Sequence, residues 1–234
     1  MLVCCDNEGC IVDAKGQRFD LPALQDLAAG IADFPGAFTI CTGRAVPYVE
    51  AMVQVLDLTA SVTPCVCEGG GVFYTPCEDR YEAIAGRVDG DAIRALLPVG
   101  AYREELGKVA CYTVYPEPGY TVDDLYALVT ARLPPGVEVN RSIASVDVTP
   151  AGVDKMYGIR ALLDRVGSEW ADVLAIGDSW NDLPMLRAAG LSACPANAVP
   201  EVKAIVDYVS PLTATRGVAD ILRWAAAYPH VQVS

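Results

Sequence analysis

The sequence predicts an α/β protein in which a Rossmann-like parallel sheet is interrupted by a smaller α+β insert. Short apolar runs alternate with helical stretches towards both ends of the chain, as in successive βαβ units. The middle of the chain instead contains strand-like runs that follow one another and can pair antiparallel. With 234 residues, the chain is long enough for one such core and one insert.

The first part of the core begins with an apolar run at residues 2–6, typical of a buried strand. A helical stretch follows within residues 16–36, where we expect Asp20 to be the N-cap and Pro22 to lie in the first turn. The next expected elements are a strand at 37–44, a helix at 47–58, a strand at 61–68 and a glycine turn at 69–71. This alternation predicts parallel strands joined by right-handed crossovers.

The alternation breaks after about Thr75, and we expect the insert to span residues 78–150. Its expected elements are helices at 90–97 and 122–133 and strands at 108–116, 136–142 and 145–150. The core would then comprise residues 1–77 and 151–234. After the insert come a helix at 155–166, a strand at 173–178, a helix at 183–190, a strand at 191–194, another helix, a strand at 208–210 and a last helix to Trp224.

The charge balance and the cysteines exclude several classes of function. The chain has 17 basic and 30 acidic residues, a net charge of -13, which argues against nucleic acid or a membrane surface as partner. No apolar run approaches the ~20 residues of a membrane span, and we expect a cytoplasmic protein. Nine cysteines and a single histidine, His230, are more typical of buried free thiols than of structural zinc.

Polar residues follow the ends of three predicted strands. Asp6 and Glu8 end the first run, and side chains two apart in a strand share a face, so these carboxylates would repel without a nearby cation. Thr42 and Arg44 end the second strand, and "IGDSWNDLPML" at 176–186 follows a later one. Because ligands of such sheets bind at the carboxyl ends of the strands, these residues predict one shared site.

The order of these motifs resembles the haloacid dehalogenase (HAD)-like phosphatases, in particular their Cof-type branch with a subclass IIB cap. "DNEGC" matches the family's Asp-x-Asp-Gly-Thr at Asp6 and Gly9, and Thr42 in "TGR" matches its second motif. Lys155 matches the third motif, and residues 177–182 match Gly-Asp-x-x-Asn-Asp in full. "CEGGG" and "CPANAVPEVK" are similar to further segments of the branch, so the resemblance extends over nearly the whole chain.

The resemblance implies a phosphatase that hydrolyses a small phosphorylated metabolite, such as a sugar phosphate or phosphoglycolate, through an aspartyl-phosphate on Asp6. It implies Mg²⁺ as cofactor, bound by Asp6, Asp178 and the backbone carbonyl of Glu8. The carboxyl group of Glu8 would be the general acid and base. Lys155 would neutralise charge on the phosphoryl group.

Phosphate-binding residues implied by the resemblance are Thr42, Gly43, Lys155 and Asn181. Asp182 would either stand near the metal or orient Lys155 through a salt bridge. Arg44 would either form a structural ion pair or contact substrate.

Two residues depart from the family pattern: Glu8 replaces the usual Asp and adds a methylene, and Cys10 replaces the usual Thr. Three alternatives therefore remain open. The chain could transfer the phosphoryl group to another hydroxyl, as phosphomutases of the same cap class do, or it could be a low-turnover phospho-switch or binding protein. The polar residues could also merely cap helices and turns. A monomer or a homodimer is compatible with the sequence.

Overall fold

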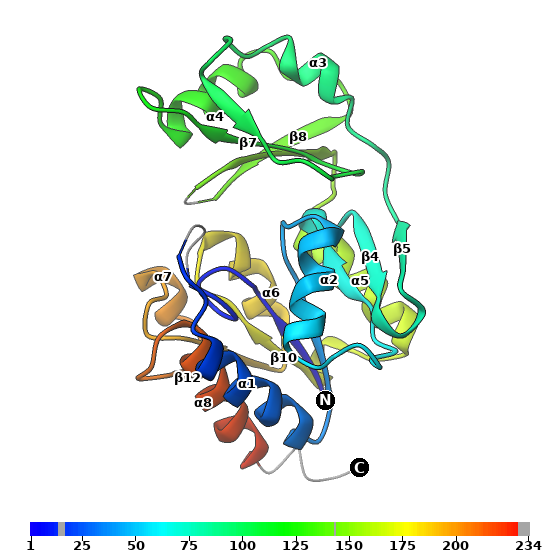
Figure 1. The fold of residues 1–234 in the computed structure, drawn as a ribbon, viewed down its shortest axis with the longest axis vertical. Helices are drawn as coiled ribbons and strands as arrows, with labels where there is room; N and C mark the ends of the chain where they lie inside the picture. Colours follow the sequence, from blue (N-terminus) through cyan, green and yellow to red (C-terminus); the bar gives the residue numbers. More distant parts are fainter. Residues whose placement is uncertain (14–16, 143, 229–234) are drawn as a thin grey trace.

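The computed structural model describes residues 1–13, 17–142 and 144–228, so His230 lies outside the described residues. Figure 1 shows a core at the bottom and a smaller cap above it. The core contains a five-stranded parallel sheet in the order β12-β11-β10-β1-β2. Its strands are β1 (Leu2–Cys5), β2 (Ala37–Ile40), β10 (Val173–Ile176), β11 (Leu191–Cys194) and β12 (Tyr208–Val209). This sheet confirms the predicted fold class.

Helices cover both faces of this sheet because alternate strand residues point to opposite sides. In β1, Val3 and Cys5 join one apolar cluster, whereas Leu2 and Cys4 join the other. The first cluster includes residues of α1 (Leu21–Asp33), α2 (Val46–Val55) and α8 (Ala214–Ala226). The second includes residues of α5 (Lys155–Val166), α6 (Leu183–Ala188) and α7 (Pro200–Lys203). Both faces of β1 are therefore buried, and its apolar run ends where the polar site begins.

The first helix begins as its sequence predicts. The Asp20 side chain accepts a hydrogen bond from the Ala23 N–H at 3.1 Å, and Pro22 lies in the first turn. Such an N-cap contributes about 1 kcal/mol to helix stability. The nine cysteines are all free thiols, as expected, and only Cys77 is exposed.

The expected strand at 61–68 is shorter than predicted and pairs differently. β3 (Cys65–Cys67), β4 (Val72–Thr75) and β5 (Arg80–Ala83) form a separate antiparallel sheet. A bridge between Cys41 and Val66 joins it to the parallel sheet. The cause is the 3₁₀ turn η1 (Glu68–Gly70), in which Gly69 and Gly70 have φ of 65° and 105° and reverse the chain. A second such turn, η2 (Pro76–Glu78), connects β4 to β5.

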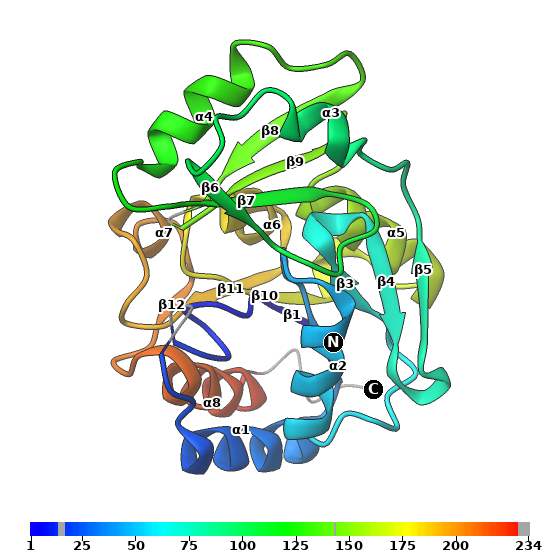
Figure 2. The same ribbon diagram turned by 45° about the horizontal axis from the view of Figure 1, so that its top comes forward.

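The cap contains a four-stranded antiparallel sheet in the order β6-β7-β9-β8. Its elements are α3 (Gly90–Arg94), β6 (Tyr102–Glu104), β7 (Tyr112–Pro116), α4 (Val122–Thr130), β8 (Val137–Arg141) and β9 (Val146–Pro150). Figures 1 and 2 show both helices on the sheet face turned away from the core. Because β5 pairs with the core strand β4, we propose that the cap begins after Ile84 rather than at residue 78.

Alternation also divides the cap sheet. Tyr112 and Val114 pack with the helices in an apolar cluster, whereas Tyr115 and Asp147 line the space above the core. The remaining 3₁₀ turns are η3 (Trp170–Asp172) and η4 (Trp180–Asp182). In the described part of the chain, every helix is too short or too polar to cross a membrane.

Candidate active site

The site lies where β1, β2 and β10 end, at the edge of the core that faces the cap (Figure 2). A cavity of about 420 Å³ separates this edge from the cap sheet. The predicted residues that line it are Asp6, Glu8, Gly43, Arg44, Asp178 and Asn181. The cap contributes Glu105, Lys108, Tyr115, Ser145 and Asp147 among others. Topology thus brings together residues more than 170 positions apart in the sequence.

Lys155 stands directly behind Asp6. Its side chain is only 6% exposed, and its Nζ donates to Asp6 Oδ1 at 2.5 Å and to Asp182 Oδ1 at 2.6 Å. Burial alone would lower the pKa of Lys155, but Asp182 and Asp6 raise it well above its usual value. The ammonium therefore stays charged and is the cation that the Asp6 carboxylate requires.

The N-cap of α5 and the close packing of this helix place Lys155 beside Asp6. Lys155 is the first residue of α5, and the preceding Asp154 caps the helix by accepting from the Tyr157 N–H at 2.8 Å. Further along α5, a Cβ on Gly158 would lie 2.7 Å from the Cα of Gly70. These two glycines allow the start of the helix to press against the η1 turn.

Asp182 orients its neighbours more than it faces the cavity. It is fully buried, and its Oδ2 accepts from the backbone N–H groups of Asp178 and Ser179, each at 3.1 Å. Its other oxygen holds Lys155. Of the two roles left open for Asp182, the geometry favours the salt bridge. Asn181 lines the cavity, and its Oδ1 accepts from the Ser179 hydroxyl.

Asp6 and Asp178 form a buried acidic pair. Burial raises the pKa of Asp6 well above its usual value; Lys155 lowers that pKa, whereas neighbouring carboxylates raise it. Burial, followed by the Asp182 charge, raises the pKa of Asp178 to about 7. Gly9 allows its own backbone to lie against the Asp178 carboxylate, since a Cβ on Gly9 would lie 2.1 Å from Asp178 Oδ2.

The donors at this pair fit a hard divalent cation. Ligand atoms of Asp6, Asp178 and Cys10 lie within 4.8 Å of one another. Burial raises the pKa of the Cys10 thiol well above its usual value, so this group stays protonated and is a poor ligand for Mg²⁺. Two carboxylates in excess of one lysine are the charge pattern that a bound Mg²⁺ would neutralise.

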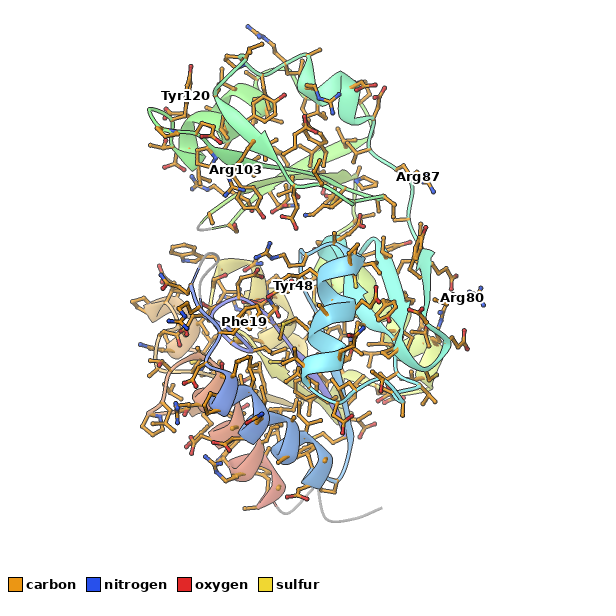
Figure 3. All side chains as sticks on the ribbon, in the orientation of Figure 1. Phe19, Tyr48, Arg80, Arg87, Arg103 and Tyr120 are labelled. Carbon is orange, nitrogen blue, oxygen red and sulfur yellow. The ribbon has the colours of Figure 1, made fainter. Side chains whose placement is uncertain are left out.

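Glu8 has a different cation beside it. Its carboxylate accepts from the Arg44 Nε, and 31% of its side chain is exposed. The Arg44 guanidinium also lies 4.5 Å from the centre of the Tyr48 ring, and its Nη1 is 3.7 Å from Glu105 of the cap. Figure 3 shows Tyr48 on α2 at the edge of the core below the cap, and Arg103 above it on the cap. Arg44 therefore pairs with Glu8 and also lines the cavity, so both of its expected roles remain compatible with its position.

Thr42 lies beneath the cavity. Its side chain is fully buried, its Oγ1 accepts from the Arg44 N–H at 3.1 Å, and its carbonyl accepts from Gly69 at 3.0 Å. Gly43 lines the cavity next to it, with open space where a Cβ would be. At Gly43 the loop thus presents backbone rather than a side chain to the site.

Some residues of the site were not singled out by sequence reasoning. Lys108 of the cap is buried, donates to Thr113 and lies 3.7 Å from Asp147. In the sequence it is one charge before a strand-like run, with no motif around it. Asn197 donates from Nδ2 to the Gly9 carbonyl at 2.8 Å, and the segment "CPANAVPEVK" was its only signal.

Comparisons with known proteins match this arrangement. A family model described as haloacid dehalogenase-like hydrolase matches residues 120–222. A phosphoglycolate phosphatase of Methanothermobacter thermautotrophicus is 30% identical over 231 residues, which cover 93% of this chain and 95% of that protein. The chain belongs to the haloacid dehalogenase-like hydrolase family. Another phosphoglycolate phosphatase, from Methanopyrus kandleri, is 48% identical over 199 residues, 79% of this chain and 80% of the relative.

Solved HAD-like structures share the whole fold. A Thermoplasma acidophilum protein has a TM-score of 0.78 at 22% identity, covering 95% of this chain and 96% of that one. A sugar phosphatase of HAD subclass IIB has a TM-score of 0.69 at 19% identity, covering 96% and 98%. The family resemblance expected from the motifs is thus confirmed, and HAD-family phosphatases among the relatives support a phosphatase here.

Proposed function

We propose that this chain is a Mg²⁺-dependent phosphatase that hydrolyses a small phosphate monoester through an aspartyl-phosphate on Asp6. The observation that supports this most is the grouping of Asp6, Lys155 and Asp178 beneath a cavity covered by the cap. A carboxylate nucleophile is repelled by a phosphate dianion unless cations accompany it. Mg²⁺, held by Asp6, Asp178 and the Glu8 backbone carbonyl, would supply the main part of that positive charge.

The chain's own groups would act in two steps. A carboxylate oxygen of Asp6 attacks phosphorus, the ester P–O bond breaks, and the carboxyl group of Glu8 gives its proton to the leaving oxygen. Water then attacks the phosphorus, Glu8 takes a proton from it, and the bond to Asp6 breaks to release phosphate. Lys155 orients Asp6 through its hydrogen bond and would stabilise the negative charge that develops on the phosphoryl group.

A lysine of the cap beside the cavity favours a small substrate with a polar group close to its phosphate. Lys108 is the cap cation beside the cavity, and its ammonium is held by Thr113 and flanked by Asp147 and Glu105. Burial opposes its charge, yet neighbouring acidic groups raise the pKa of Lys108. A charged Lys108 suits a leaving group with a carboxylate or hydroxyl close to the phosphate. Together with the names of the relatives, this favours phosphoglycolate as the first substrate to test and sugar phosphates as the second.

The nine free thiols support a reducing compartment such as the cytoplasm. Neither a nucleic-acid partner nor a membrane is part of the proposal, in keeping with the net charge of -13.

The test is phosphate release from phosphoglycolate, and in parallel from a panel of sugar phosphates, with and without Mg²⁺. We expect turnover that requires Mg²⁺, is abolished in Asp6→Asn and is unchanged in Asp26→Asn, an exposed residue on α1. Acid-quenched protein should carry one phosphoryl group on Asp6 during turnover. Activity in Asp6→Asn close to that of the wild type would refute the assignment.

A further inference from the structure

Glu68 is a fully buried carboxylate in the segment "CEGGG", and it was not among the candidate site residues. It sits in the η1 turn of the core, yet its side chain reaches into the cap. Its oxygens accept from three consecutive backbone N–H groups, those of Val109, Ala110 and Cys111, with the shortest distance 2.7 Å to Ala110. These donors satisfy the hydrogen-bonding capacity of a carboxylate that water does not reach.

The backbone of Glu68 is unusual as well. Its φ of 52° lies in the left-handed region, which costs a residue with a side chain of order 1 kcal/mol or more. The conformation aims the side chain at the cap while the backbone stays with the core. Strain of this kind persists where the surrounding contacts determine it, and here those contacts are the N–H groups at 109–111.

Backbone hydrogen bonds also connect the η1 turn to the loop at 42–44 of the core. The Glu68 N–H donates to the Arg44 carbonyl at 3.0 Å, and the Gly69 N–H donates to the Thr42 carbonyl at 3.0 Å. On the cap side, the segment 109–111 follows directly after Lys108, a cap cation that lines the cavity. Glu68 thus connects the loop at 42–44 of the core to the cap segment that directly follows Lys108.

We propose that Glu68 is a positioning residue that holds the cap backbone at 109–111 against the core and thereby sets the place of Lys108 over Asp6. The kinetic part of this inference rests on the proposed phosphatase function, whereas the structural part does not. The strand expected at 108–116 is shorter than predicted. β7 begins only at Tyr112, because the amides of 109–111 donate to Glu68 instead of to a neighbouring strand.

Hydrogen–deuterium exchange tests the contact without any substrate. In the wild-type protein, the amides of 109–111 should exchange much more slowly than those of the neighbouring segment 106–108. In Glu68→Gln, protection at 109–111 should fall at least tenfold, while protection of β1 and β10 is retained. Glu78→Gln, which changes an exposed carboxylate in the η2 turn between β4 and β5, should change neither. Fast exchange at 109–111 in the wild type would overturn the inference even if the variant did not fold.

Kinetics test whether Glu68 acts through Lys108. We expect Glu68→Gln to raise KM about tenfold or more with a smaller change in kcat, which is the effect of losing one charge-assisted contact to the substrate. Lys108→Met should raise KM similarly, and the double variant should be no worse than Lys108→Met alone. Effects that multiply in the double variant would contradict a role through Lys108.

The two proposals fail in different ways. If the wild type releases no phosphate from any ester but 109–111 are protected in a Glu68-dependent manner, the proposed function fails and the contact stands. If phosphate is released but Glu68→Gln leaves both exchange and KM unchanged, the positioning role fails and the phosphatase stands.

Discussion

Replacement of Lys155 by methionine is the sharpest test of the electrostatics beneath the site. Lys155→Met keeps a long, buried side chain but removes the ammonium that lies 2.5 Å from Asp6 and 2.6 Å from Asp182. Both carboxylates are less than 10% exposed, so water cannot readily replace the lost partner. Removing one member of a buried ion pair typically costs about 3–5 kcal/mol of stability.

The cost should depend on pH in a definite direction. Lys155 is what lowers the pKa of Asp6, so without it that pKa, already raised by burial, rises further. A carboxyl group whose pKa is higher in the folded than in the unfolded state lowers stability above its unfolded value near ~4. Protonation relieves this penalty as the pH falls. The loss should therefore be largest near pH 8 and smaller at pH 5 by on the order of 1–3 kcal/mol.

Urea denaturation of metal-free protein at both pH values measures this loss, with Lys203→Met, an exposed lysine of α7, as control. The control should stay within about 0.5 kcal/mol of the wild type. A loss below about 1 kcal/mol in Lys155→Met, or the same loss at both pH values, would refute the reasoning.

Three further predictions follow from the site and the fold. Glu8→Gln should lower kcat by about 10²–10⁴, and Glu8→Asp by less because it keeps the carboxyl group; equal kcat in the glutamine variant would contradict the acid/base role. Since the pKa of Asp178 is raised to about 7 without metal, a proton should compete with Mg²⁺, and calorimetry should show affinity falling up to about tenfold per pH unit below 7. Gly70→Ala should lower the free energy of unfolding by about 2–4 kcal/mol, because its Cβ would lie 1.9 Å from the Asp154 carbonyl; Gly100→Ala, with a similar positive φ in open space, should lose only about 1 kcal/mol.

The fold could be predicted from the sequence wherever local pattern and final environment agree. β1 and β10 are apolar on both faces, as strands of a covered parallel sheet must be, and their runs end on acidic residues. The strand at 61–68 was different, because its pairing is decided by the glycine turn that follows it and by β4, which has no separate signal of its own. Apolar periodicity indicates which residues of a strand are buried, but it does not indicate with which neighbouring strand that strand pairs.

The candidate site, like the fold, could be predicted from the sequence only in part. Asp6, Thr42 and Asp178 stand in short motifs that follow strand ends, and Lys155 stands in a motif at the start of a helix. Glu68 lies in the quoted segment "CEGGG", but its contact was not predicted, because it depends on backbone N–H groups some 40 residues away in the cap and no side-chain pattern marks such donors. Lys108 belongs to the same class, since its partners Thr113 and Asp147 lie on two cap strands that no motif relates to it.

The split between a core edge and an opposing cap sheet also affects how such a protein can change in evolution. Residues on the inner face of the cap, such as Tyr115 and Asp147, can vary without disturbing the groups around Asp6, because the two sets belong to different sheets. The segment 105–111 is the exception, since it contacts Arg44 through Glu105 and Glu68 through its backbone. A chimera that exchanges caps between relatives therefore has to carry this segment over together with Glu68 and Arg44, as one inherited unit.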